Sequence, residues 1–404
     1  MLEILLAGAI ATSASDIHLE PEEESVRLRF RLDGVLNDIT FFDNKLYTQL
    51  LSRIKLVSGL KLNIKHTAQD GRFSITLGES NIEIRTSVLP GAYGESIVLR
   101  VLNPKSILVN FSDLGIEPSL FSVVEKEIKK PNGLILLTGP TGSGKTTSLY
   151  AFLRTINSPE SKIITIEDPI EYHLNGINQT QVDKSKDYTF LTGLRSALRQ
   201  DPDVIMVGEI RDEETAKIAV NASLTGHLVF STLHTNNAAG TIPRLIDLGV
   251  NAKVIDAALN LAIAQRLVRK LCEVCKEKYA PEGAEKKLLE EVRASIVARS
   301  PRESSGVASR PVPEITVVYR AKEGGCSACH TTGYRGREGV FEAIIVDQLI
   351  SKTLSENPNE REIRVAAKGQ GLLEMRQDGV LKVLAGSTSL VELGRVVDLS
   401  EEII

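Results

Sequence analysis

The sequence predicts an α/β fold in which a parallel sheet with helices on its faces follows a smaller α+β domain. Short apolar runs alternate with helical segments between residues 131 and 268, which is typical of a parallel sheet. The first hundred residues instead alternate apolar and polar side chains in hairpin-like pairs. All four cysteines lie beyond residue 268 in two C-x-x-C pairs, which favours a metal-binding insertion.

Length and composition limit the class of protein. A chain of 404 residues is long for one core and favours two or three domains. Hydrophobic content of 42% and charged content of 25% are ordinary for a soluble globular protein. The net charge of −4 gives no reason to expect nucleic acid, and no apolar stretch is long enough to span a bilayer. We therefore expect a cytoplasmic protein that docks to a membrane only through partners.

The first domain, residues 1–103, is expected to combine an amphipathic helix with two hairpins. In the first hairpin Val26, Leu28 and Phe30 alternate with arginines, and Asp33-Gly34 supplies the turn. The arginine row is the solvated face of a sheet in the simplest interpretation. The expected elements are a helix near the N-terminus that uses Leu2, Leu5, Leu6 and Ala9, strands over Val26–Leu32, Val35–Ile39, Arg72–Leu77, Asn81–Val88 and Ile97–Leu102, and a helix over Leu46–Leu60.

The rest of the chain divides by pattern into a linker, a parallel-sheet domain, a cysteine region and a helical end. The expected linker, residues 104–130, contains one helix over Pro118–Lys129. The sheet domain covers residues 131–268, the cysteine region 269–342 and the helical region 343–404. The expected parallel strands of the sheet domain are Leu134–Leu137, Ile163–Ile166, Val204–Val207 and Leu228–Thr232.

The segment Gly139–Thr146 fits G-x-x-x-x-G-K-[ST] and follows an expected strand directly. Its glycines let successive backbone N–H groups face one point, and a helix beginning near Lys145 directs its positive end there. Lys145 would reach the β- and γ-phosphates of a nucleoside triphosphate, and the Thr146 hydroxyl would hold Mg²⁺. The predicted nucleotide-binding residues of this loop are Gly139, Pro140, Thr141, Gly142, Ser143, Gly144, Lys145, Thr146 and Thr147.

Two acidic residues are expected at the ends of neighbouring strands. Glu209 follows the strand Val204–Val207, and Glu167 with Asp168 ends the strand before it. Parallel sheets bind ligands at the carboxyl ends of their strands, so these acids would share the tasks of holding Mg²⁺ through water and accepting a proton.

Two histidines, His227 and His234, flank the strand Leu228–Thr232. Their positions suggest a γ-phosphate sensor, although a single histidine is more often a core or surface residue.

The two C-x-x-C pairs are Cys272 with Cys275 and Cys326 with Cys329. A reducing cytoplasm disfavours disulfides, so the four thiols favour a tetrahedral Zn²⁺ site. Fifty residues separate Cys275 from Cys326, which is longer than in compact zinc ribbons. Separate thiols or redox pairs remain the alternative.

Taken in order, these motifs resemble the secretion ATPase superfamily, and most closely the type II secretion and type IV pilus assembly ATPases. The resemblance covers nearly the whole chain. The blocks that carry it are Gly139–Thr146, Ile166–Glu171, Leu194–Asp203, Val207–Asp212 and Thr225–His234, the front segments Ser15–Pro21, Gln69–Arg72 and Gly94–Arg100, the four cysteines and Thr332–Gly339.

The resemblance implies a RecA-like motor domain preceded by a PAS-like domain, with the motor blocks serving as Walker A, Asp box, Walker B and His box. It implies Glu167 as general base, Glu209 as the Walker B acid near Mg²⁺, and His227 and His234 as γ-phosphate sensors. It also implies a set of nucleotide-directed arginines, from the front domain and from the motor. These are Arg72, Arg85, Arg195 and Arg199.

The family further implies an ATP hydrolase that needs Mg²⁺ and carries Zn²⁺. Such enzymes work as homo-hexamers at the inner membrane, with a platform protein and the pilin or pseudopilin assembly machinery. Two departures from the family pattern concern its front segment. Members usually carry a further N-terminal domain, so the chain is expected to be a short member or a fragment, and Ala68 replaces a common proline. Because retraction ATPases normally lack the tetracysteine element, assembly is favoured over retraction.

The rival hypothesis is a nucleic-acid-translocating motor, because helicases share the RecA-like core. Mild acidity and an aromatic content of 4% count against it. A nucleotide-regulated scaffold without hydrolysis is a third possibility, against which the two strand-end acids argue.

Overall fold

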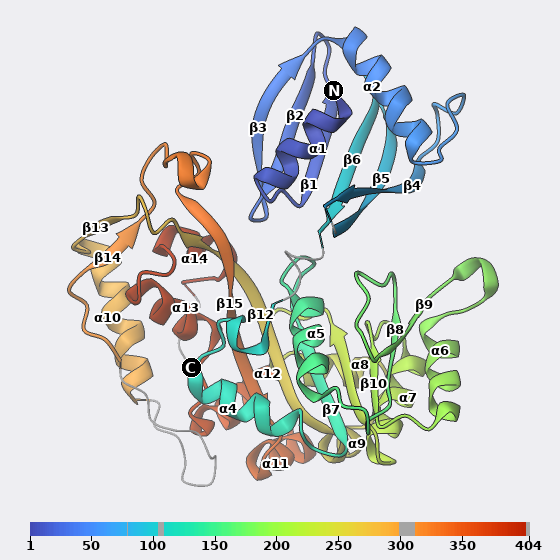
Figure 1. Ribbon diagram of the computed structural model, residues 1–404. Coiled ribbons are helices and arrows are strands. Elements are labelled where there is room, and N and C mark those ends of the chain that lie inside the picture. Colours follow the sequence, from blue (N-terminus) through green and yellow to red (C-terminus); the bar gives the residue numbers. More distant parts are fainter. Residues whose placement is uncertain (79, 104–108, 299–311, 401–404) are drawn as a thin grey trace. The chain divides into compact units, whose positions relative to one another are not determined.

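The computed structural model describes residues 1–78, 80–103, 109–298 and 312–400. The chain divides into two compact units, Met1–Leu108 and Val109–Ile404, each with its own apolar core (Figure 1). No helix among the described residues is long and apolar enough to cross a membrane.

The first unit is a six-stranded antiparallel sheet with two helices on one face. The strand order is β3-β2-β1-β6-β5-β4. Its elements are α1 (Leu2–Ala11), β1 (Asp16–Pro21), β2 (Val26–Leu32), β3 (Val35–Phe42), α2 (Asn44–Val57), β4 (Gln69–Leu77), β5 (Ser80–Gly91) and β6 (Gly94–Leu102).

The alternation of β2 explains this packing. Val26, Leu28 and Phe30 are buried in one core with residues of α1 and α2, and the intervening arginines lie on the other face. α2 begins at an Asp43 cap, whose carboxylate accepts the N–H of Leu46 at 2.7 Å. The expected N-terminal helix, both hairpins and the helix near residue 46 are confirmed.

The second unit is built on a seven-stranded sheet with the order β15-β12-β7-β11-β10-β8-β9. Neighbouring strands are parallel except β12 and β15, which pair antiparallel. The strands are β7 (Gly133–Thr138), β8 (Ile163–Glu167), β9 (Asn178–Gln181), β10 (Val204–Val207), β11 (Leu228–Leu233), β12 (Leu259–Leu271) and β15 (Tyr334–Ile345). β13 (Glu277–Tyr279) and β14 (Val318–Arg320) form a separate two-stranded sheet.

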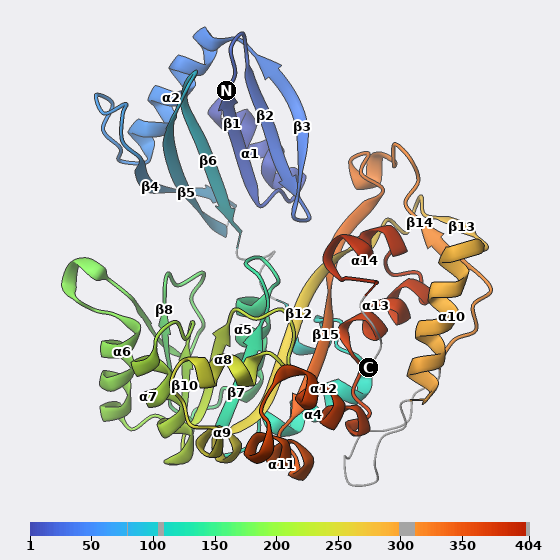
Figure 2. The same ribbon diagram turned by 180° about the vertical axis from the view of Figure 1, so that it is seen from behind.

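Helices cover both faces of this sheet. One face packs against α4 (Pro118–Glu127) and α5 (Lys145–Ile156). The other face, which is toward the viewer in Figure 2, carries a second group of helices. They are α6 (Phe190–Ala197), α7 (Glu213–Leu224), α8 (Thr241–Asp247), α9 (Ala252–Ala258), α10 (Gly283–Ala298), α11 (Gln348–Glu356), α12 (Glu360–Ala367), α13 (Met375–Leu384) and α14 (Leu390–Val396). Short 3₁₀ turns include η1 (Phe111–Asp113), η2 (Lys184–Lys186), η3 (Leu198–Gln200), η5 (Ser327–Cys329) and η6 (Lys368–Gln370).

The four predicted parallel strands are confirmed as β7, β8, β10 and β11, and the mixed α/β class is confirmed with them. β9, β12 and β15 were not predicted. β12 crosses position 268 and β15 crosses position 342, so the main sheet continues into the cysteine region. The proposed divisions within the second unit stay predictions. Residues 104–108 of the expected linker and 401–404 of the expected helical region lie outside the described residues.

Candidate nucleotide site

The phosphate loop joins the end of β7 to the start of α5. Gly139, Gly142 and Gly144 have φ values of 144°, 80° and 87°, a region that side chains rarely adopt. A Cβ on Gly139 would lie 2.5 Å from the carbonyl oxygen of Gln265. The loop therefore folds tightly back against β12, and the glycines of the motif are required by its shape.

The loop has the features of an anion cradle. The first helical hydrogen bond of α5 runs from the N–H of Ser148 to the carbonyl oxygen of Gly144, at 3.0 Å. The N–H groups that precede Ser148 in α5 therefore have no partner within the helix. The hydroxyl of Ser143 is buried and has no hydrogen-bond partner among the described residues. Thr146 is exposed in the first turn, where its hydroxyl is open to a metal ion. These residues fit a bound polyphosphate with Mg²⁺.

Lys145 lies over the loop, and its Nζ donates to the carbonyl oxygens of Gly139 at 2.7 Å and Pro140 at 3.1 Å. Burial lowers the pKa of Lys145, the cation of Arg266 lowers it further, and Glu209 opposes both. Two cations thus converge on a partly buried loop. A bound phosphate group would stabilise the charged form of both.

Glu209 and His234 meet at the carboxyl edge of the sheet. Glu209 lies two residues beyond the end of β10, and His234 directly follows β11. Oε2 of Glu209 is 3.5 Å from Nε2 of His234, and its Oε1 is 2.5 Å from Nη2 of Arg211. Glu209 is 12% exposed and its two partners are largely exposed. Glu209 is therefore held between His234 and Arg211 at the carboxyl edge of the sheet.

The loop after β11 is tied to the end of β7 by threonine hydroxyls. The N–H of Thr235 donates to Oγ1 of Thr138 at 2.7 Å, and Nη2 of Arg266 donates to Asn236 O at 2.8 Å. Because β11 pairs with β7 in parallel, these bonds place the His234 segment beside the start of the phosphate loop.

Glu167 ends β8, but its carboxylate points into a buried polar cluster. It accepts hydrogen bonds from Tyr150 of α5, from Thr165 of β8 and from Gln179 of β9. Burial raises the pKa of Glu167, and these three donors oppose the rise. The two strand-end acids thus lie in different surroundings, one open to the site and one enclosed.

The structure does not bring every predicted residue to the loop. His227 precedes β11, at the opposite edge of the sheet, and its Nδ1 lies 3.0 Å from Ala222 O. Arg195 and Arg199 are exposed on α6 and η3. The Arg199 guanidinium donates to the backbone oxygen of Arg195 at 3.0 Å. Among the described residues, the contacts of both side chains are with neighbours on this surface and not with the phosphate loop.

Arg72 and Arg85 belong to the first unit, where they are directly paired across β4 and β5. Arg100 of β6 continues the same row on the other side of Arg85. Carboxylates already lie beside two of the three: Asp16 is 3.2 Å from Nε of Arg100, and Glu83 is 3.2 Å from Nε of Arg85. Like charges on cross-strand neighbours repel, so this row is suited to a further anion.

The four cysteines come together as predicted. All four Sγ atoms lie within 4.8 Å of one another, with separations of 3.8 Å for Cys272–Cys326 and Cys275–Cys329 and 3.7 Å for Cys326–Cys329. Zn–S bonds of about 2.3 Å in a tetrahedron require S···S edges of about 3.8 Å. The N–H groups of Cys326 and Gly333 donate to Sγ of Cys329, which suits a thiolate. The donor set fits Zn²⁺, and the distances exclude a disulfide.

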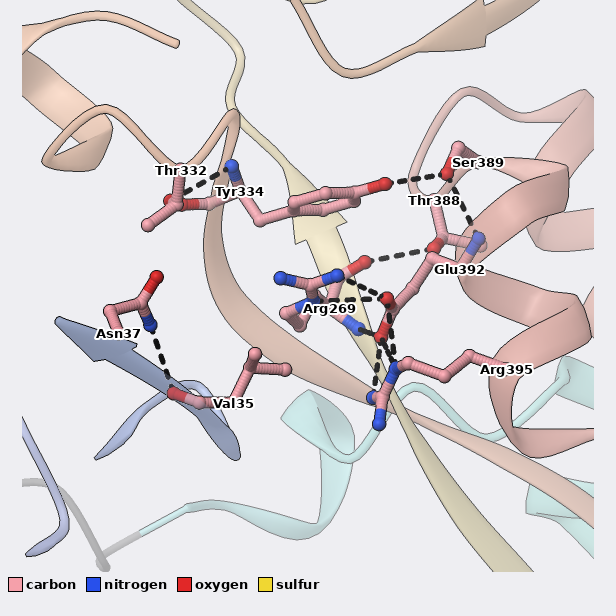
Figure 3. Close-up of polar contacts among 9 residues, drawn as sticks. All are labelled: Val35, Asn37, Arg269, Thr332, Tyr334, Thr388, Ser389, Glu392 and Arg395. Carbon is pink, nitrogen blue, oxygen red and sulfur yellow. Dashed lines mark hydrogen bonds and ion pairs between the residues drawn. The ribbon is translucent and has the colours of Figure 1, made fainter. Parts of the chain in front are cut away.

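Beside the cysteines, a buried carboxylate fastens α14 to β12 (Figure 3). Glu392 accepts from Nη2 of Arg269 at 2.6 Å and from Nη2 of Arg395 at 2.7 Å, and its side chain is fully buried. The Arg269 guanidinium lies 4.0 Å over the Tyr334 ring, whose hydroxyl is 2.8 Å from Oγ of Ser389. The strand that leads to Cys272 is therefore anchored on both sides.

Sequence reasoning missed the contributions of Tyr150, Gln265 and Arg266. Gln265 is buried, and its Oε1 accepts the hydroxyl of Ser148 at 2.8 Å. A polar pair within the apolar run Leu259–Leu271 was the available signal. Gln265 lies beside the phosphate loop because β12 pairs with β7, and no local sequence pattern indicates that pairing.

Comparison with known proteins agrees with this geometry. A family model described as "Type II/IV secretion system protein" matches residues 1–395. The chain is 45% identical over 396 residues to type II secretion system protein E of Pseudomonas aeruginosa, covering 98% of this chain and 74% of the relative. It is 44% identical over 393 residues to the type IV pilus assembly ATPase PilB of Acinetobacter baylyi, covering 97% and 65%.

A solved structure supports the same assignment. The fold is similar to the pilus retraction motor PilT with bound ADP, with a TM-score of 0.63 and 26% identity over 98% of this chain and 97% of that one. With the family match spanning nearly all of its residues, the chain belongs to the type II/IV secretion system protein family.

Proposed function

We propose that this protein is a Mg²⁺-dependent ATP hydrolase that drives assembly of a type IV pilus or a type II secretion pseudopilus. The observation that carries the proposal is the convergence of Lys145, Glu209 and His234 on one phosphate loop. The names of its relatives, type II secretion system protein E and the assembly ATPase PilB, support the cellular role.

The residues divide the work of hydrolysis. Lys145 binds the β- and γ-phosphates, and the Thr146 hydroxyl with Glu209 holds Mg²⁺, directly or through water. When bound, Mg²⁺ neutralises charge on the phosphates. Glu167 is proposed to accept the proton of the attacking water, which requires the water to reach its enclosed carboxylate. The water oxygen bonds to the γ-phosphorus as the bond between that phosphorus and ADP breaks. His234, held by Glu209, donates to a γ-phosphate oxygen, and His227 is proposed as a second γ-phosphate sensor.

Arginines complete the catalytic set. Arg72 and Arg85 of the first unit, and Arg195 and Arg199 of the second, are proposed to reach a nucleotide, including the nucleotide of a neighbouring copy. An arginine that arrives at the transferring phosphate raises the rate by about 10³–10⁵. A homo-hexamer would supply such contacts between copies. We also propose one Zn²⁺ at the four cysteines, as a structural ion.

The proposed location is cytoplasmic and peripheral at the inner membrane. Contact with the membrane would be made only through partners, namely an inner-membrane platform protein and the pilin or pseudopilin machinery. No role in nucleic-acid transport is proposed.

The test is ATP turnover by the full chain and two variants. Lys145→Ala should bind a fluorescent ATP analogue about 10–100-fold more weakly, because it loses hydrogen bonds to charged oxygens. Glu209→Gln should keep binding but lose about 10²–10⁴ in kcat. Lys129→Ala, which removes an exposed cation paired with Glu125, is the matched control and should behave like the parent. Parental turnover by Lys145→Ala would refute the proposal.

The same ATP turnover assay distinguishes the proposed function from that of a nucleic-acid-translocating motor. Addition of single-stranded or duplex DNA across a salt series should leave turnover unchanged. DNA-stimulated hydrolysis that weakens with salt would favour a nucleic-acid motor instead.

A further inference from the structure

A buried polar cluster surrounds Glu167 and supplies its carboxylate with several hydrogen-bond donors. Glu167 is 3% exposed, and its carboxylate accepts from donors on three separate elements: Tyr150 of α5, Thr165 of β8 and Gln179 of β9. Among the groups that influence it, the charged one is Glu171, another acid. The hydrogen bonds that the carboxylate accepts thus come from neutral donors.

The direction of the Tyr150 hydrogen bond is set by its surroundings. An ionised carboxylate can only accept hydrogen bonds, so the Tyr150 hydroxyl is the donor to Oε2 of Glu167. Burial and the adjacent carboxylate both raise the pKa of Tyr150, which keeps the hydroxyl proton on the phenol. The Tyr172 ring holds the Tyr150 ring edge-on, with centroids 4.6 Å apart.

Gln179 fixes the opposite side of the carboxylate. Its Nε2 donates to Oε1 of Glu167 at 3.1 Å and to Tyr172 O at 3.1 Å, and its Oε1 accepts the N–H of Leu174 at 2.6 Å. The segment that follows β8 is thus folded around the same amide that orients Glu167. The tyrosine is the one donor that comes from the helix of the phosphate loop.

Tyr150 lies five residues after Lys145 on α5, and the helix is regular between them. Tyr150 therefore connects Glu167 to the helix whose first turn follows the phosphate loop. Neither Thr165 nor Gln179 has this connection, because both lie on strands beside Glu167.

We propose that Tyr150 is a positioning residue for Glu167, which keeps the carboxylate ionised and oriented as proton acceptor and links it to the helix that binds phosphate. The inference rests on the proposed function, in which Glu167 takes a proton from the attacking water. No proton of Tyr150 is consumed: the phenol donates a hydrogen bond throughout, and the proton gained by Glu167 passes on to solvent with the release of phosphate.

The test is the pH dependence of kcat for Tyr150→Phe. Loss of a donor to the ionised carboxylate raises its pKa, so the acid limb of the profile should move to higher pH by about one unit. KM for ATP should stay near the parental value, because the change lies away from the phosphate loop. The Glu171, Tyr172 and Arg154 side chains near the cluster are unchanged in the variant.

Tyr188→Phe is the matched control. It removes a phenol that donates to Oγ1 of Thr180 on the same strand as Gln179, at 2.9 Å, so the bond that is lost does not involve Glu167. Its acid limb should coincide with that of the parent. Thr165→Val removes a different donor to Glu167 and should shift the limb in the same direction, which keeps the inference testable if Tyr150→Phe fails to fold.

Glu167→Gln distinguishes a failure of the proposed function from a failure of the inference. If it hydrolyses ATP at the parental rate, the base assignment in the proposed function is wrong, and the inference falls with it. If it is inactive while the profiles of Tyr150→Phe and Thr165→Val coincide with the parent, the inference alone is wrong. An effect of Tyr150→Phe on KM without a change in the profile would also overturn it.

Discussion

The carboxylate of Glu209 lies 3.5 Å from Nε2 of His234, and this pair links the ends of β10 and β11 beside the phosphate loop. His227 directly precedes β11 and His234 directly follows it, so the six residues of this strand separate the two histidines. The two histidines of this segment therefore differ in what they can contact within the unit.

The histidine pair gives the first prediction. His234→Ala should lower kcat about tenfold or more, because a donor to the γ-phosphate and a partner of Glu209 are both lost. His227→Ala should reduce turnover much less when the unit acts on its own nucleotide. Steady-state kinetics of both variants at saturating ATP would decide, and equal losses would contradict the larger contribution expected of His234.

The arginine row gives a second prediction. Arg72→Ala should lower turnover with little change in binding of a fluorescent ATP analogue, as expected for a cation that acts mainly in the transition state. Arg27→Ala is the control, because Arg27 lies on the same face but is paired with Asp38 at 2.7 Å. Equal losses of activity in the two variants would contradict a specific role of Arg72 in hydrolysis.

The cysteine cluster predicts one zinc ion per chain. Cys326→Ser should abolish stoichiometric metal, and Ser327→Ala next to it should retain the metal. Elemental analysis of the purified chains gives the answer directly. A folded parent protein without zinc would contradict the assignment.

The buried Glu392 predicts a loss of stability on substitution. Glu392→Ala leaves Arg269 without its carboxylate and should cost about 3–5 kcal/mol, or roughly 10 °C in Tm. Glu125→Ala, which removes an exposed partner of Lys129, should change Tm by about 1–2 °C or less. Differential scanning calorimetry compares the two, and similar values would contradict the role of the pair.

The same carboxylate gives stability a defined pH dependence. Burial by itself raises the pKa of Glu392, but the donors from Arg395 and Arg269 outweigh it and hold the pKa below its usual value. A lowered pKa in the folded state means that this contribution is present above the unfolded pKa and is lost as pH falls through the folded one. The parent should therefore lose more Tm than Glu392→Ala on acidification from neutral pH, and parallel curves would contradict this.

Local motifs predicted the phosphate loop, the four central strands and the cysteine cluster well, because each depends on spacing within a short segment or on a single residue type. Arg266 was missed because its contact with the loop requires β12 to pair beside β7. The enclosure of Glu167 was missed for a similar reason, since its donors come from α5 and β9. Strand-end position indicated which acids matter, but not which way a side chain points.

The continuity of β12 has a practical consequence for handling the protein. One strand passes from Gln265, against the phosphate loop, to Leu271, the residue before the first of the four clustered cysteines. Oxidation of the thiols would act on residues that directly follow the far end of this strand. Purification buffers should therefore be chosen with the thiols in mind before any ATP-binding measurement is interpreted.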